Sequence, residues 1–116
     1  MVEFLKIGKK EYPARIGYNV MKAVKQKTGK EWSEALKEGK EDLELHETIL
    51  YAALQAGAYA EGQELDIKKE DIAFVLDLCF FEYMKLLSSD KFFPKEEVDA
   101  IEGKLKEAGL TMEEEN

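Results

Sequence analysis

Apolar and polar residues alternate on either side of a glycine near the start of the chain, a pattern typical of two short β-strands. A two-residue turn at Gly8 and Lys9 would join them into a β-hairpin, because glycine readily adopts the positive φ that such a turn requires. Lys6 and Glu11 would then face each other on one side. The other side would carry Leu5, Ile7 and Tyr12. Because isolated hairpins are marginally stable in water, this apolar side must pack on the rest of the chain.

The remaining pattern has the period of helices, interrupted by capping residues and glycines. The expected helices span residues 20–28, 31–38, 43–60, 67–88 and 94–107. The expected N-terminal residues of four of them are Asn19, Asp42, Asp66 and Pro94. The expected C-terminal stops are Gly29, Gly39, Gly62 and Gly109. These elements predict an α+β fold that is mainly helical, with four to five helices after the hairpin. We expect one domain over residues 1–110 and a disordered acidic tail over 111–116.

The helix expected over 67–88 is apolar on nearly every side, since thirteen of the sixteen residues from Ile72 to Leu87 are apolar. Such a helix lies at the centre of a fold or buries a second face in a partner. Its charged residues, Asp77, Glu82 and Lys85, exclude a membrane span. The preceding helix carries small residues that would let another helix pack closely: Ala52, Ala53, Ala56 and Gly57.

Charge is divided unevenly along the chain, whose net charge is −8. Residues 1–40 contain ten Lys or Arg and five Glu, whereas residues 41–116 contain seven Lys and twenty Asp or Glu. The acidic majority argues against non-specific nucleic-acid binding, which depends on Lys and Arg. Either the basic part folds against the acidic part, or a charged surface selects a basic partner. A single cysteine, Cys79, excludes an intramolecular disulfide and fits a reducing compartment.

The residues that most often carry catalysis are sparse. His46 has no Cys or His at ligand spacing, so we expect a histidine on the surface of an acidic helix rather than a metal site. Cys79 lies among Leu78, Phe80 and Phe81, which indicates core packing rather than a nucleophile. No phosphate-binding loop or calcium-binding loop is present. We therefore expect no enzyme activity, no cofactor and no bound metal.

Large aromatic residues are numerous for one small core, which favours a protein that binds other proteins. They are Trp32, Tyr51, Tyr59, Phe74, Phe80, Phe81, Tyr83, Phe92 and Phe93. Either one core encloses most of them, or several form an exposed patch of the kind that marks an interaction surface.

The order of these features resembles one family. The opening LKIGKKEYPARIGYNVMKAVKQKTGKEW, the middle ETILYAALQAG and the apolar DIKKEDIAFVLDLCFFEYMKLL are similar to the tail assembly chaperones of long-tailed bacteriophages and prophages. The likeness covers residues 4 to about 87. It implies a small, acidic, helical, non-enzymatic protein of the host bacterial cytoplasm. Such proteins coat the tape measure protein, recruit tail tube subunits during tail assembly and leave before the virion is complete.

Set beside this resemblance, the residues suggest how a client would bind. Apolar surface from Leu50, Leu54, Phe74 and Phe81 would shield apolar stripes of the tape measure protein. Glu44 and Glu47, with Glu61 and Glu64, would keep the complex soluble and attract basic stretches. The partners expected are the tape measure protein, the tail tube protein and further copies of the chain, but neither nucleic acid nor membrane. The alternatives are an acidic phage regulator or DNA-mimicking inhibitor, and a small enzyme with a carboxylate site.

Overall fold

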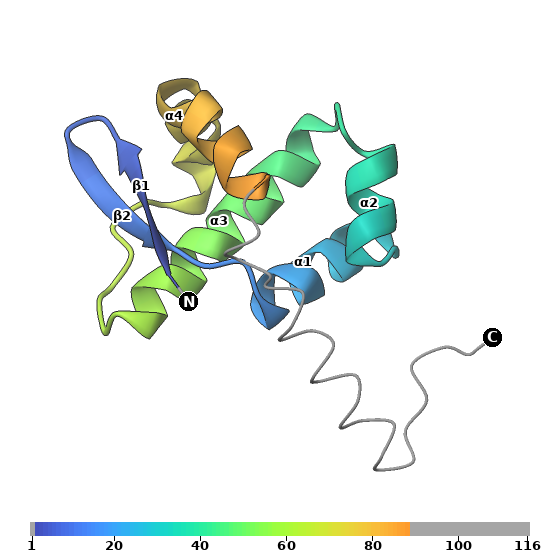
Figure 1. The fold of residues 1–116 in the computed structure, drawn as a ribbon, viewed down its shortest axis with the longest axis horizontal. Coiled ribbons are helices and arrows are strands. Elements are labelled where there is room, and N and C mark those ends of the chain that lie inside the picture. Colours follow the sequence, from blue (N-terminus) through green and yellow to red (C-terminus); the bar gives the residue numbers. More distant parts are fainter. Residues whose placement is uncertain (1, 89–116) are drawn as a thin grey trace, which may run out of the picture.

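The computed structural model describes residues 2–88, which form a β-hairpin followed by four α-helices (Figure 1). The elements are β1 (Glu3–Ile7), β2 (Lys10–Ala14), α1 (Tyr18–Thr28), α2 (Trp32–Glu38), α3 (Leu43–Ala60), the short 3₁₀ turn η1 (Lys69–Asp71) and α4 (Ile72–Leu87). The α+β, mainly helical fold expected from the sequence is confirmed. The helix expected over 94–107, the tail over 111–116, and Phe92 and Phe93 lie outside the described residues.

The hairpin has the register that its glycine predicts. Lys6 pairs with Glu11 and Leu5 with Tyr12, and Gly8 has a φ of 65° in the turn. Leu5 is buried and Tyr12 partly buried, so the apolar side is covered. Strand β2 lies against α3 and β1 lies against α4. The helices thus stabilise the hairpin, which would be only marginally stable on its own.

Helix α1 begins two residues earlier than its capping pattern indicates. Asn19 is inside the helix, and the N-cap is Gly17, whose carbonyl accepts from the N–H groups of Val20 and Met21. The expectation that Asn19 is the cap is therefore wrong, because backbone bonds alone begin the helix. The expected stop is right: Gly29 adopts the left-handed conformation and donates its N–H to the Lys25 carbonyl at 2.7 Å.

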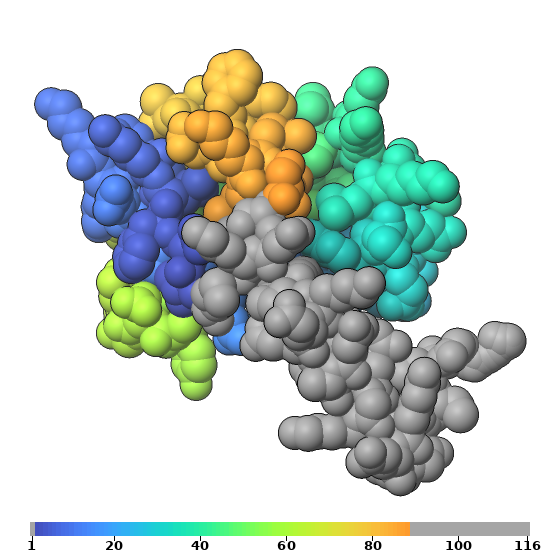
Figure 2. Space-filling view, in the orientation of Figure 1, coloured from blue at the N-terminus to red at the C-terminus, as the bar shows by residue number. Residues whose placement is uncertain are grey.

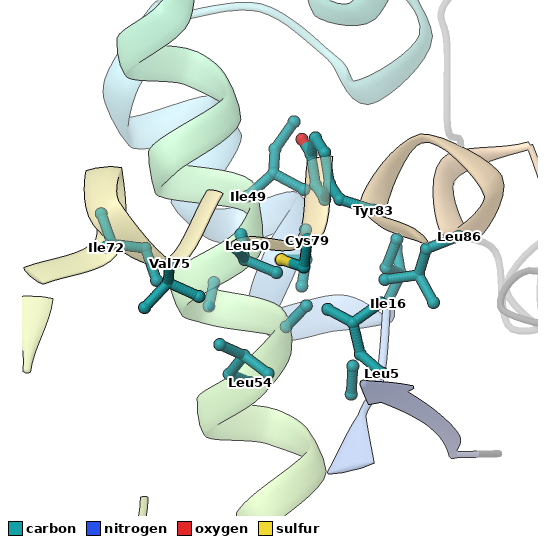
Figure 3. Close-up of a cluster of buried hydrophobic side chains, with 14 of the residues drawn as sticks. Leu5, Ile16, Ile49, Leu50, Leu54, Ile72, Val75, Cys79, Tyr83 and Leu86 are labelled. Atoms are coloured by element: carbon teal, nitrogen blue, oxygen red, sulfur yellow. The ribbon is translucent and has the colours of Figure 1, made fainter. Parts of the chain in front are cut away.

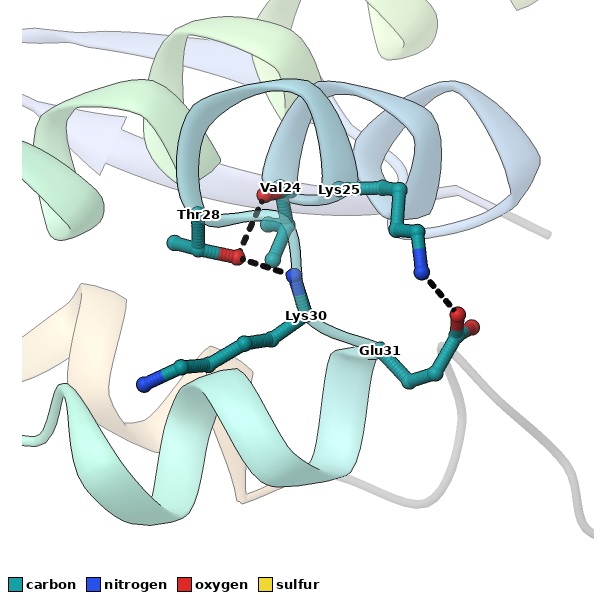
Figure 4. Close-up of polar contacts among 5 residues, drawn as sticks. All are labelled: Val24, Lys25, Thr28, Lys30 and Glu31. Carbon is teal, nitrogen blue, oxygen red and sulfur yellow. Dashed lines mark hydrogen bonds and ion pairs between the residues drawn. The ribbon is translucent and has the colours of Figure 1, made fainter.

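The turn between α1 and α2 is held by local polar contacts (Figure 4). The Thr28 hydroxyl donates to the Val24 carbonyl at 2.8 Å and accepts from the Lys30 N–H at 3.0 Å. Lys25 forms an ion pair with Glu31 at 2.5 Å, and Lys30 forms another with Glu38. All these charged groups are solvent-exposed, so their main effect is to orient the two helices rather than to stabilise them strongly.

Helix α3 runs through the centre of the domain and packs against α1, β2 and α4. Asp42 caps it as expected, since its carboxylate accepts from the Leu45 N–H at 3.2 Å. The small residues of α3 admit a strand as well as a helix. A Cβ atom added to Gly57 would lie 2.2 Å from the Pro13 carbonyl oxygen. One turn earlier, the Ala53 carbonyl accepts a hydrogen bond from the Arg15 N–H at 2.9 Å.

The segment leading into α4 departs from the sequence-based expectation. Asp66 does not cap a helix over 67–88, because α4 begins at Ile72 after the turn η1. Its carboxylate instead accepts from the Lys10 ammonium at 2.8 Å, which ties this segment to the hairpin turn. Lys10, with a smaller contribution from the Tyr12 hydroxyl, holds the pKa of Asp66 below its usual value. A contact over 56 positions has thus replaced the local cap.

The hydrophobic core lies where α4 crosses α3 above the hairpin (Figure 3). It contains Leu5, Ile16, Ile49, Leu50, Leu54, Ile72, Val75, Cys79, Tyr83 and Leu86. These side chains come from β1, the β2–α1 connection, α3 and α4. These four parts of the chain therefore share one continuous apolar core.

Candidate functional site on helix α4

Helix α4 has two apolar faces with different surroundings. One face is buried in the core and consists of Ile72, Val75, Cys79, Tyr83 and Leu86. The other, which we name the outer face of α4, consists of Phe74, Leu78 and Phe81, with 70%, 66% and 79% of their surfaces exposed. In the space-filling view α4 forms the upper edge of the molecule, with bulky side chains projecting outward (Figure 2). The helix thus presents large apolar groups to solvent over two turns.

Helix α4 is kinked within the stretch that carries both faces. Cys79 has non-helical backbone angles, with φ −136° and ψ 23°, and divides α4 into two halves. Its side chain is buried as expected, and burial, with a smaller effect of nearby Glu82, raises the pKa of the thiol to about 11. The flanking residues that indicated this core packing, Leu78, Phe80 and Phe81, are themselves exposed, so other side chains bury Cys79. The rings of Phe80 and Phe81 contact each other edge to face, with 6.0 Å between their centroids.

The polar end of the buried face corrects the expectation for His46. This histidine is buried, not on the surface, and its Nδ1 lies 2.8 Å from the Tyr83 hydroxyl. Its Nε2 lies 2.8 Å from the Lys40 carbonyl oxygen, which can only accept. Nε2 therefore carries a proton, and in the neutral ring Nδ1 accepts from Tyr83. Burial raises the pKa of the Tyr83 hydroxyl above its usual value, so it stays protonated as a donor. The pair joins α3 to α4.

Two of the four predicted apolar binding residues are not at the surface. Leu50 and Leu54 are fully buried, because α3 is central and neighbours cover this side of it. As they stand in this structure they present no surface to a client. Phe74 and Phe81 lie on the outer face of α4, so the structure brings these two together. The helical period of residues 43–60 gave the direction of each side chain but could not show that neighbours would cover more than one side of α3.

The predicted acidic residues, Glu44 and Glu47, line a shallow open hollow of about 490 Å³. The hollow lies between α1, α3 and the start of α4 and is lined by Lys27, Glu44, Glu47, Thr48, Lys69, Glu70 and Ile72. Glu44 accepts from the Lys27 ammonium at 2.8 Å, which raises the pKa of that lysine. Part of the acidic charge is therefore neutralised by the basic N-terminal region within the fold. The same holds for Lys10 and Asp66.

Sequence reasoning missed Leu78 as a surface residue, together with the acids beside it. Asp77 and Glu82 are exposed on α4 and form no ion pair with any described residue. A signal was available, since Phe74, Leu78 and Phe81 follow one another at intervals of four and three, the spacing of a single helix face. The apolar side chains between them, at Val75 and Cys79, obscured that stripe.

Residues 2–88 contain no group of three or more His, Cys, Asp or Glu side chains placed to hold a metal ion. None of the helices in this range is long and apolar enough to cross a lipid bilayer. Comparison with protein-family models, with curated proteins and with solved structures found no match. The outer face of α4 and the sequence motifs quoted above are therefore the features that bear on function.

Proposed function

We propose that this chain is a non-enzymatic tail assembly chaperone of a long-tailed phage or prophage, which binds the tape measure protein and recruits tail tube subunits. The observation that carries the proposal is the outer face of α4. A small domain that exposes three large apolar side chains in register on one helix has a surface suited to another protein. The resemblance of the sequence motifs supports the tape measure protein as the client, and the outer face offers a surface on which it could bind.

The physical role would be to shield apolar surface. Fully burying one Phe or Leu side chain is favourable by about 1.5–3 kcal/mol, so a client that covers the outer face gains several such contributions before the costs of association. One such contact is weak. Many copies along a long client would hold it together while each copy remains replaceable by a tail tube subunit.

The alternative of an acidic regulator or DNA mimic depends on negative charge held free at one surface. Glu31, Glu38, Glu44 and Asp66 are all paired with lysines in the fold, which lowers the free negative charge at α2, at the start of α3 and in the segment before η1. Exposed aromatic groups on α4 are of no use for imitating phosphates. These observations favour the chaperone.

Co-expression with the tape measure protein tests the proposal. The wild-type chain should raise the soluble fraction of the client, and the Phe74→Ser/Phe81→Ser variant should lose this effect. Tyr59→Ser is the matched control, because Tyr59 is an exposed aromatic residue at the far end of α3. If the client is equally soluble with or without the wild-type chain, the chaperone role is wrong. Recruitment is tested separately, by capture of the tail tube protein on the client complex.

A further inference from the structure

We infer that the outer face of α4 binds an amphipathic α-helix whose apolar seam is flanked by Lys or Arg. The inference rests on the proposed function in that both use this face, but it specifies the chemistry of the bound segment. It starts from the spacing of Phe74, Leu78 and Phe81, which is that of the d, a and d positions of a heptad. Lys85 occupies the next a position.

Asp77 and Glu82, which were not predicted as binding residues, occupy the flanking positions of the same heptad. With Phe74 and Phe81 at d, Asp77 falls at the g position and Glu82 at the e position of the heptad, the two positions that flank an a/d seam. Both are exposed, and neither forms an ion pair with residues 2–88. The e and g positions set the choice of partner in paired helices. Two unpaired acids there favour a partner with basic residues at its own e and g positions.

The same charges disfavour two other occupants. Consider first α4 of a second copy paired with this face. In a parallel pair, Asp77 of each copy would face Glu82 of the other copy. In an antiparallel pair, Asp77 would face Asp77 and Glu82 would face Glu82. Each arrangement brings carboxylates together. The chain's own residues 89–116 carry four Lys and nine Asp or Glu, so they are also acidic. A basic partner is the occupant that charge complementarity selects.

The kink and the short length of the seam determine the kind of contact. Phe74 and Phe81 are seven residues apart, or about 10 Å along a helix, and Cys79 bends the helix between them. A partner helix therefore meets the face over about two turns. Because such a contact buries little apolar area, its preference among partner helices depends mainly on their charge. Its affinity should fall with added salt, since the flanking charges are exposed.

Two synthetic helical peptides test the inference on the full chain. Both have Leu at a and d, and they differ in carrying Lys or Glu at e and g. We expect the Lys peptide to bind at least about tenfold more tightly at low salt, the scale of one or two exposed charge pairs. The Asp77→Lys/Glu82→Lys variant should reverse the preference. Glu34→Lys/Glu41→Lys is the matched control, because it changes the net charge equally at two exposed acids on α2 and in the segment before α3.

Four results would overturn the inference. The first is equal binding of both peptides, and the second is an equal effect of the control variant. The third is concentration-dependent self-association of the wild-type chain that Phe81→Ser abolishes, which would make a second copy the occupant. A peptide of residues 89–116 that binds as tightly as the Lys peptide would likewise replace the partner by the chain itself.

If the client is solubilised but the peptides are not discriminated, the inference alone fails. If the peptides are discriminated but the client is not solubilised, the proposed function alone fails.

Discussion

Both faces of α4 are apolar, but one is buried in the core and the other is exposed to solvent. Ile72, Val75 and Leu86 on one face are buried in the core that α4 shares with β1 and α3, whereas Phe74 and Phe81 on the other face are exposed to solvent. A helix that is apolar all round was expected either to be central or to bury a second face in a partner. In this domain it does the first with one face and leaves the other uncovered. Apolar composition predicts that a face will be covered, but the fold decides which one it covers itself.

The largest expected effect comes from a matched pair of leucines on the two faces. Leu86 has 6% of its surface exposed and Leu78 has 66%, in the same helix and with the same side chain. Leu86→Ala should lower the free energy of unfolding by about 2–5 kcal/mol, because it leaves a cavity in the core. Leu78→Ala should change it by less than about 0.5 kcal/mol. Urea denaturation measures both, and equal losses would show that the outer face is covered in the folded monomer.

The next effect concerns the residue between the faces. Since the pKa of Cys79 rises from 9.0 to about 11 on folding, the native thiol should react with iodoacetamide roughly 100-fold more slowly than the unfolded chain at pH 8. The raised pKa stabilises the fold fully below pH 9, and this contribution is lost as the pH rises toward 11. Rapid alkylation without denaturant would contradict the burial of this side chain.

A smaller effect should follow removal of the polar tip of the buried face. Tyr83→Phe keeps the ring but leaves Nδ1 of His46 without its donor, at a cost of about 1–2 kcal/mol. Tyr59→Phe is the control, because Tyr59 is exposed and should show no measurable change. Thermal unfolding of the two variants compares them directly. A neutral result for Tyr83→Phe would mean that another group replaces the lost hydroxyl.

The smallest effect is expected at the ion pair that holds the segment before α4 against the hairpin. Because Lys10 keeps the pKa of Asp66 low in the folded state, this carboxylate stabilises the fold above about pH 4. That contribution is lost as the pH falls through the lowered pKa. Asp66→Asn should therefore be slightly less stable than wild type at pH 7, and the two should converge near pH 2. A difference that persists in acid would point to another cause.

Local signals in the sequence predicted much of the fold. Gly8 defined the hairpin register, Asp42 the start of α3, and Gly29 and Gly39 the ends of two helices. These features depend on residues within four positions of one another, so their chemistry is visible without a fold. The predicted start of α4 was wrong because Asp66 binds Lys10, and a contact between residues so distant in the sequence cannot be read from a local pattern.

Only part of the candidate site could be predicted from the sequence, because the rest depends on contacts between distant parts of the chain. Phe74 and Phe81 were identified because α4 has more apolar surface than one core contact can cover. Leu50 and Leu54 were misplaced, and His46 was expected at the surface, because α3 is enclosed by elements distant in the sequence. Tyr83 follows its partner His46 by 37 positions. Periodicity gives the direction of a side chain on its helix but not what lies opposite.

The close approach of β2 to α3 provides a reporter for the assembly of this domain. The Arg15 amide donates to the carbonyl of Ala53, a pairing that exists while the strand rests on the glycine side of the helix. Deuterium uptake at that single amide would therefore follow undocking of the hairpin separately from melting of α3. An amide that exchanges before those of the α3 interior would show that the hairpin detaches as a unit, whereas simultaneous exchange would show that the strands and the central helix open in one step.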